Sequence, residues 1–310
     1  MRWDFHGLII EGKTNDASLE GSWRRSFGSR PISTAEADIV YELNVVDEVM
    51  AAPAGEPQFR QEDLLAYYLV GQMVVVHFPR YGRLELDLEK GRTNGRIVAA
   101  ALNTYGVLED IIAIGLSPHL RRNDMFLIHA FAAAYEGRAA LLVGGVGAGK
   151  TTTGMALLNA GWRLLSNDSP ILNDEGMVLS YPGVLAAYGD TFGRFPATAY
   201  LETAVPEKEG RAKITIEAEA VWPGGWLDAA PAGAIFFPRI EDRSDHVVER
   251  ISAPEVLRRL LPHAVEQWDR EMIGRHLLLL RNLVEKTLAY TLRLGLDVLG
   301  IPSKLVDWVD

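Results

Sequence analysis

The sequence contains no cysteine, and its 31 basic residues are outnumbered by 41 acidic ones. Without a thiol the chain forms no disulfide, no thiolate metal site and no cysteine nucleophile, which fits a reducing cytoplasm. The formal net charge of -10 provides no general attraction to nucleic acid or to an anionic membrane. We therefore expect neither of these partners, and we expect any phosphate-binding site to be local.

Long hydrophobic runs are also missing. The apolar stretch near the start, from Leu8 to Ile10, is too short for the hydrophobic region of a signal peptide. No later run approaches the length that a transmembrane helix needs. These absences predict a cytoplasmic protein with no membrane partner.

A chain of 310 residues with 48% hydrophobic content can bury one large core or two modest ones. We predict a β-rich N-terminal domain (1–117) and a second domain (118–310). The N-terminal part contains short β-type runs separated by turn residues, and Leu84, Leu86 and Leu88 alternate as in a half-buried strand. The clearest predicted strands are 41–49, 74–78 and 83–89. A turn is expected around Gly91 and Gly95, followed by a helical pattern.

A glycine-rich stretch follows a buried apolar run in the second domain. The order is an expected strand at 125–135, a turn at Glu136 and Gly137, a strand ending before Gly144, the loop, a helix closed by Gly161, and another strand. A phosphate-binding P-loop needs this context of strand, glycine-rich loop and helix, and the residues match its GxxxxGK[ST] pattern. The alternative is a turn that only caps the helix and leaves its lysine in solvent.

Each residue type in this loop suits a polyphosphate. Glycines let backbone N–H groups approach the phosphates at the positive end of a helix, a lysine reaches the β- and γ-phosphates, and a threonine hydroxyl completes Mg²⁺ coordination. We therefore predict binding of ATP with Mg²⁺. The predicted nucleotide-binding residues are Gly144, Gly145, Val146, Gly147, Ala148, Gly149, Lys150, Thr151 and Thr152.

Magnesium also needs a carboxylate from a neighbouring strand end. Asp168 follows the apolar run at 163–166 and is the candidate, so Thr151 and Asp168 are the predicted metal ligands. The alternative is an aspartate that shapes the turn before Ser169 and Pro170.

The segment 128–172 resembles the HPr kinase/phosphorylase-like family, whose nucleotide core is related to phosphoenolpyruvate carboxykinase. The matching features are His129 before the P-loop, Gly161 and Arg163 after its helix, and a pair of residues eighteen positions beyond Lys150. This pair is two acids in the family and is Asn167 and Asp168 here. The resemblance implies an α/β or α+β fold with a P-loop core of this type, a smaller β-rich N-terminal domain and a helical C-terminus.

The resemblance further implies a kinase-like phosphotransferase that moves the γ-phosphate of ATP to a hydroxyl acceptor on a protein, a peptide or a small molecule. In the family the first acid acts as the base, so its replacement by Asn167 leaves His129 and Asp168 as the predicted catalytic residues. His129 could equally be a satisfied core histidine. An ATP-binding module without turnover, acting as a sensor or assembly partner, is the alternative function. The family also suggests a homo-oligomer.

Further expectations concern the C-terminal part. Arg211 and Arg239 are candidate cations for the γ-phosphate, although exposed arginines usually lie in solvent. The segment 252–296 is expected to be helical, starting with a capping box at Ser252 and Glu255 and interrupted at Pro262. Its apolar stripe is expected at Leu277, Leu280, Val284 and Leu288.

Overall fold

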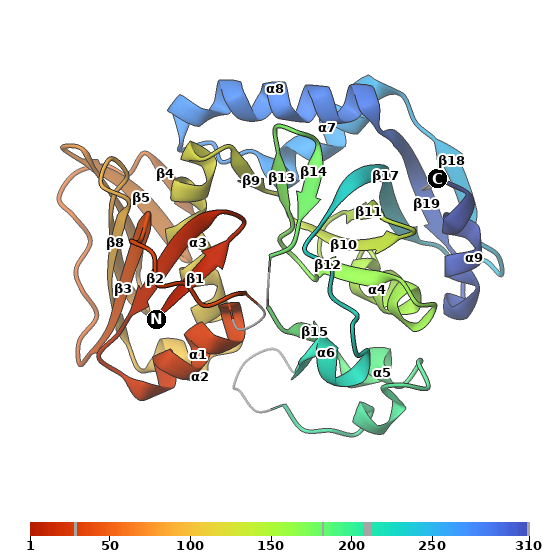
Figure 1. The fold of residues 1–310 in the computed structure, drawn as a ribbon, viewed down its shortest axis with the longest axis horizontal. Coiled ribbons are helices and arrows are strands. Elements are labelled where there is room, and N and C mark those ends of the chain that lie inside the picture. Colours follow the sequence, from red (N-terminus) through yellow and green to blue (C-terminus); the bar gives the residue numbers. More distant parts are fainter. Residues whose placement is uncertain (28–29, 182, 207–212, 309–310) are drawn as a thin grey trace. The chain divides into compact units, whose positions relative to one another are not determined.

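The structure is a computed structural model that describes residues 1–27, 30–181, 183–206 and 213–308. It is a mixed α/β protein with several sheets and helices, as expected (Figure 1). Contacts divide the chain into two compact units. Among the described residues, unit 1 contains Met1–Asn123 and Gln267–Arg270, and unit 2 contains the others. Within these ranges, no helix combines the length and the apolar character needed to cross a bilayer.

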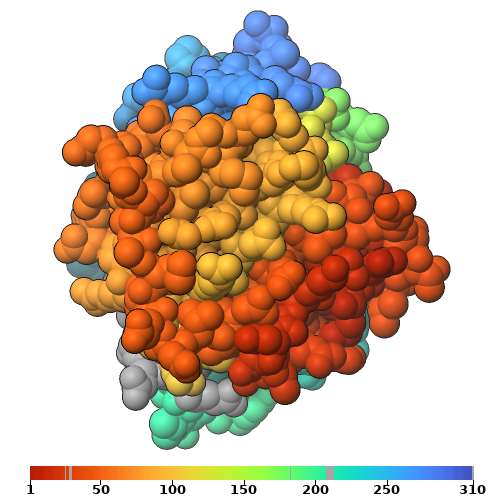
Figure 2. All heavy atoms as spheres, turned by 90° about the vertical axis from the view of Figure 1, so that its left-hand side faces the viewer, coloured from red at the N-terminus to blue at the C-terminus, as the bar shows by residue number. Residues whose placement is uncertain are grey.

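Unit 1 contains an eight-stranded sheet with the order β1-β2-β3-β8-β7-β6-β5-β4. The pairs β2–β3 and β3–β8 are parallel, and the other neighbours are antiparallel. The three predicted strands correspond to β3, β6 and β7. Figure 2 shows the face of this unit in red to yellow. The strands are β1 (Arg2–Phe5), β2 (Leu8–Lys13), β3 (Ile39–Val46), β4 (Phe59–Gln61), β5 (Leu65–Val70), β6 (Met73–Phe78), β7 (Gly82–Asp87) and β8 (Arg92–Val98).

Helices α1 (Ala17–Phe27), α2 (Ala100–Asn103) and α3 (Val107–Arg122) complete unit 1. Its core is rich in aromatic rings, and Trp23 packs against both Phe27 and Tyr41. The predicted turn at Gly95 is wrong, because Gly95 lies inside β8. A Cβ there would lie only 2.4 Å from Leu43 Cδ1, so this glycine makes room for core leucines rather than for a turn.

Unit 2 is built on a nine-stranded mixed sheet. Its central strands β11, β17 and β19 are parallel, and the outer neighbours pair antiparallel. Glu136 and Gly137 form the predicted turn between β10 and β11, both with positive φ. The strands are β9 (Met125–Leu127), β10 (Ala130–Tyr135), β11 (Arg138–Val143), β12 (Arg163–Ser166), β13 (Ile171–Asn173), β14 (Met177–Leu179), β17 (Ala229–Ile240), β18 (Val247–Arg250) and β19 (Leu288–Leu294).

Helices cover both faces of this sheet (Figure 1). Residues alternate along β11: Leu142 packs on the side of α4 (Lys150–Asn159) and α9 (Ile301–Leu305), and Leu141 packs on the side of α7 (Ala253–Ala264) and α8 (Arg270–Lys286). The central strands are therefore buried on both faces, as parallel strands usually are. Helix α4 lies close to the sheet, because a Cβ on Gly154 would lie 2.3 Å from the Phe131 ring.

The smaller elements of unit 2 lie between β14 and β17 in the sequence. A two-stranded sheet joins β15 (Leu185–Ala187) to β16 (Ile214–Ile216). Short helices α5 (Gly189–Phe192), η1 (Ala199–Leu201) and α6 (Ala218–Val221) flank it, and η2 (Val298–Gly300) and η3 (Val306–Trp308) lie near the C-terminus.

Three expectations for the C-terminal part are wrong in part. The expected helical segment forms α7 and α8 but ends at Lys286, and β19 takes the place of helix at 288–294. Ser252 is the N-cap residue of α7, but its side chain makes no capping hydrogen bond, and Glu255 pairs with Arg258 and Arg259, so no capping box forms. The buried stripe of α8 includes the expected Leu280 and Val284 together with Leu279 and Leu283, whereas Leu277 is 41% exposed and Leu288 begins β19.

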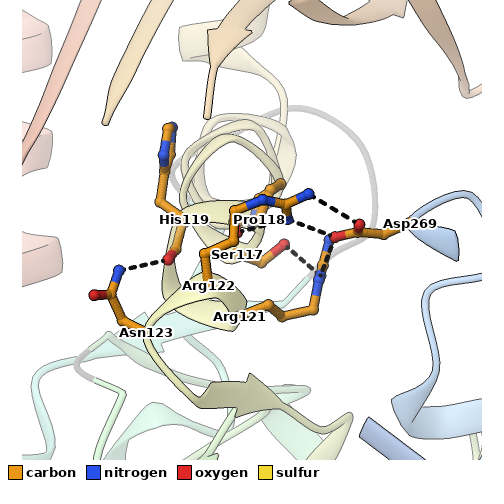
Figure 3. Close-up of polar contacts among 7 residues, drawn as sticks. All are labelled: Ser117, Pro118, His119, Arg121, Arg122, Asn123 and Asp269. Carbon is orange, nitrogen blue, oxygen red and sulfur yellow. Dashed lines mark hydrogen bonds and ion pairs between the residues drawn. The ribbon is translucent and has the colours of Figure 1, made fainter. Parts of the chain in front are cut away.

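Polar groups in unit 1 are buried around α3 (Figure 3). Asp269, only 4% exposed, accepts hydrogen bonds from Arg121 Nε at 2.9 Å and from Arg122 Nη1 at 3.0 Å. On the same helix His119 Nε2 lies 2.8 Å from Thr93 Oγ1. Because the Thr93 hydroxyl donates to the Gly115 carbonyl, His119 must donate to Thr93 from Nε2. Burial, together with Arg122 and Arg121 against an opposing effect of Asp87, lowers the pKa of His119 to about 4.

The buried His119 predicts a pH dependence for the stability of unit 1. The unfolded state takes up a proton on this residue below pH 6.5 and the folded state only near pH 4, so acidification destabilises unit 1 between these values. The shift of roughly two and a half pKa units corresponds to a loss of about 3 kcal/mol. Amide hydrogen exchange in β8 and α3, measured from pH 7 to 4 in the wild type and in His119→Gln, checks it. If hydrogen exchange in the wild type and in His119→Gln changed with pH in the same way, His119 would not be the group responsible, and the prediction would be wrong.

Candidate functional site

A glycine-rich loop (144–149) joins the end of β11 to the start of α4. Gly147 and Gly149 have φ values of 80° and 96°, a region that glycine adopts without strain. Gly149 is also crowded, since a Cβ there would lie 2.8 Å from Leu294 Cδ1 and 3.4 Å from Ile240 Cγ1. The ends of β17 and β19 therefore hold the loop against α4, and only glycine fits at this contact.

Lys150 begins α4 and is only 9% exposed. Its Nζ donates to the carbonyl oxygens of Gly144 and Gly145, at 2.5 Å and 3.2 Å, and lies 3.1 Å from His129 Nε2. Three acceptors thus surround the ammonium group. Burial lowers the pKa of Lys150, and the charge of Asp168 acts in the opposite direction.

His129 and Asp168 meet at the same place. Backbone hydrogen bonds join Ile128 to Pro170 and Ala130 to Asp168, so the residues before β10 lie beside those after β12. His129 Nδ1 is 3.3 Å from Asp168 Oδ1. Because Lys150 donates to Nε2, the neutral imidazole carries its proton on Nδ1 and donates it to Asp168. The two predicted catalytic residues and Lys150 are therefore brought together as a connected chain of polar contacts.

Neighbouring charges both raise and lower the pKa of His129. Burial has the largest effect and lowers the pKa of His129, Asp168 raises it, and Lys150 and Lys213 lower it. The imidazole is thereby kept neutral beside two cations, with one nitrogen able to accept a proton once Lys150 turns to another partner.

His263, in the last turn of α7, also belongs to this cluster. Its carbonyl oxygen accepts a hydrogen bond of 2.7 Å from the backbone N–H of His129, and the two imidazole rings stack with their centroids 6.0 Å apart. Burial, His129 and Lys150 all lower the pKa of His263. The sequence analysis missed this residue, which lies far from the loop along the chain. Its one sequence signal was its place beside Pro262, which lies in the last turn of α7.

The remaining predicted residues lie in or beside the glycine-rich loop, or next to Asp168. Thr151 and Thr152 are half-buried in the first turn of α4, beside Lys150, and Val146 in the loop is 82% exposed. Asn167 lies next to Asp168, and its Oδ1 is buried with no hydrogen-bond partner among the described residues.

The cations considered as ligands of the γ-phosphate do not all lie at the glycine-rich loop. Arg239 is at the end of β17 with 76% of its side chain exposed, and it pairs with Glu241 at 3.6 Å. Arg211 lies outside the described residues. Lys213 was not among the candidates, but its charge lowers the pKa of both His129 and Lys150.

The arrangement suits a polyphosphate better than a metal ion alone. The N-terminus of α4 has no acidic residue in its first turn, and its free N–H groups and dipole attract anions. Across the described parts of the chain, no group of three or more histidines and acids could hold a metal. One carboxylate and one hydroxyl fit Mg²⁺, because this ion usually takes few protein ligands and completes its shell with phosphates and water.

No protein-family model and no curated protein matches the chain. Solved structures do match, among them one described as the structure of the Hpr(Ser) kinase/phosphatase from Coxiella burnetii. It is 10% identical, the match covers 59% of this chain and 93% of that chain, and the TM-score is 0.31. A likeness this weak carries no argument about fold or chemistry. The proposals below therefore depend on the geometry of the site.

The polar chain predicts how the pKa of His129 responds to its neighbours. In magnesium-free buffer, Lys150→Met removes a neighbouring positive charge and should raise this pKa, whereas Asp168→Asn removes a negative charge and should lower it further. NMR titration of the imidazole Cε1–H measures both changes. The His119 resonance, from unit 1, provides an internal control that should not move. Shifts of the same sign in the two variants would contradict this geometry.

Proposed function

We propose that the loop and its neighbours bind ATP with Mg²⁺ and transfer the γ-phosphate to a hydroxyl acceptor. The observation that carries this proposal is the meeting of Lys150, His129 and Asp168 at the start of α4, where the backbone also attracts anions. This combination of strand, glycine-rich loop, helix and buried lysine has the arrangement of a P-loop.

Lys150 is the principal phosphate ligand in this proposal. Its present acceptors are two carbonyl oxygens of the loop and a neutral imidazole. Phosphate oxygens carry full negative charge and form stronger hydrogen bonds with an ammonium group than these neutral acceptors do. Phosphate binding therefore turns Lys150 away from His129 and leaves Nε2 free. Lys213 adds a second positive charge at the same side of the site.

His129 is the proposed base for the acceptor. Once Nε2 is free, it accepts the proton of the acceptor hydroxyl while the hydroxyl oxygen bonds to the γ-phosphorus and the bond to the β-phosphate oxygen breaks. Asp168 receives Nδ1–H, so it fixes the tautomer that this step needs. His263 positions the ring by stacking and by its backbone hydrogen bond. The products are ADP and the phosphorylated acceptor.

Thr151 and Asp168 are the proposed ligands of Mg²⁺. The ion would neutralise negative charge on the phosphate oxygens. Asp168 is 57% exposed along its side chain, and Oδ1 is the oxygen near His129 Nδ1, so the second carboxylate oxygen can bind a metal while Oδ1 keeps its contact with the ring.

ATP binding without turnover is the second candidate, and Asn167 is the observation that favours it. An amide takes the place of an acid beside Asp168, and its oxygen is buried without a partner among the described residues. An amide cannot accept the acceptor's proton. If His129 does not compensate, the site holds nucleotide and serves as a sensor or an assembly partner.

The nucleotide site should depend on Lys150. Lys150→Ala removes charged hydrogen bonds that contribute about 1.5 to 3 kcal/mol, which lowers the affinity for ATP with Mg²⁺ roughly tenfold to a hundredfold. Calorimetry measures the change. Arg281→Ala, which removes an exposed cation from α8 on the other face of the sheet, is the matched control and should bind like the wild type. Equal affinities in all three proteins would end the P-loop assignment.

Asn167→Asp tests which candidate function holds. The amide oxygen of Asn167 is buried, so a carboxylate here would be partly desolvated, which favours proton uptake and suits it to act as a base. General-base assistance contributes about a hundredfold to ten-thousandfold in rate, so phosphotransfer or ATP hydrolysis should rise measurably. The rate of phosphotransfer is measured with labelled ATP and a panel of hydroxyl acceptors. A reaction without acceptor measures the rate of ATP hydrolysis. Asn103→Asp in α2 makes the same chemical change in unit 1 and should have no effect.

The outcomes separate the two functions. A wild type without turnover that gains it on Asn167→Asp is a binding module derived from a kinase. A wild type that turns over, and loses activity in His129→Ala but gains nothing from Asn167→Asp, uses His129 as its base. A magnesium dependence that survives Asp168→Ala would show that the metal carboxylate comes from elsewhere.

A further inference from the structure

A second cavity lies in unit 2 between the β13–β14 hairpin, the start of β17 and the C-terminal part of α8. Figure 1 shows the tip of this hairpin reaching α8. The volume of the cavity is about 170 Å³. An apolar cavity of roughly 150 Å³ is large enough to hold a benzene molecule, so this one has room for a small organic ligand.

The cavity is at the other end of β17 from the glycine-rich loop. Ala232 lines it, whereas Ile240 contacts the loop near Gly149. The intervening strand rises about 3.3 Å per residue and so spans about 25 Å. This distance makes the cavity separate from the proposed phosphate site.

The floor of the cavity is aliphatic. Leu172, Leu279 and Leu283 line it and are 1%, 7% and 5% exposed. These side chains favour a branched hydrocarbon group and offer it no hydrogen bond. Buried among them is Thr287, which is 6% exposed and lines the same cavity. Its hydroxyl can donate a hydrogen bond to a polar group of a ligand or accept one from it.

The rim carries charges of both signs. Asp174 and Glu175 lie on the hairpin turn, and Lys286 is the last residue of α8. In the described part of the chain none of these three side chains forms an ion pair. The C-terminal end of α8 carries a partial negative charge, which the ammonium group of Lys286 offsets.

We propose that this cavity binds a small zwitterion with a branched aliphatic side chain, an amino acid of about the size of leucine. Asp174 and Glu175 receive the ammonium group, Lys286 and Thr287 bind the carboxylate, and the three leucines enclose the side chain. The site is independent of the proposed phosphate chemistry, and binding at either site is measured without the other.

Calorimetric titration of the full chain with L-leucine tests the proposal. The compounds 3-methylbutylamine and 4-methylpentanoate keep the hydrocarbon body but carry only one of the two charges. We expect saturable binding of leucine, at least tenfold tighter than either compound. Equal binding of the three compounds, or no saturable binding of leucine, would overturn the proposal.

Variants test which residues bind the carboxylate and the ammonium group of leucine. Lys286→Ala should reduce leucine binding to that of the amine, and Asp174→Asn combined with Glu175→Gln should reduce it to that of the acid. These residues are exposed, so neither change disturbs the core. Lys304→Ala on α9 is the matched control and should bind leucine normally, as should Lys150→Ala. Unchanged affinity in Lys286→Ala and in the double variant would place the leucine elsewhere on the protein.

Discussion

The buried ammonium group of Lys150 is the constraint on which the site depends. A cation that is 9% exposed needs acceptors on all sides, and the chain supplies two loop carbonyls and one imidazole nitrogen. The loop turns with positive φ at Gly147 and Gly149, a conformation that glycine adopts without strain, and the imidazole accepts only while it is neutral. Asp168 and His263 then hold that imidazole in place. The loop, the two histidines and the aspartate thus all contribute to stabilising the buried ammonium group of Lys150.

The sequence was informative where a local pattern has one structural solution. Alternating leucines indicated β7, and Glu136 followed by Gly137 marked a turn that needs positive φ. The order of strand, loop and helix around Lys150 was also readable, because the glycines and the lysine are close together along the chain. Asp168 was identified by its position after an apolar run and His129 by the family resemblance, and the structure brings both to Lys150.

The missed features depend on contacts between distant residues. Apolar spacing at 277–294 fits a helix as well as a buried strand, and only pairing with β17 makes β19 a strand. Gly95 was taken for a turn residue, because the leucines that need its space are 52 and 11 positions away. His263 reaches His129 only because α7 packs on the sheet and ends there. No pattern within the last turn of α7 indicates that its carbonyl and ring face another histidine.

The position of β19 in the sheet also bears on when the site can form during synthesis. Leu294, at the end of this strand, is the side chain that presses closest to Gly149, and it is made long after the loop itself. Ile240, on the other side of the contact, comes from a strand that pairs with β11 across some ninety residues. Such long-range pairing is slow, because the chain loses conformational entropy in bringing distant segments together before favourable contacts form. A nascent chain can thus carry the complete glycine motif before the side chains that pack against it have been made, and the loop reaches its folded environment only once β19 has been synthesised.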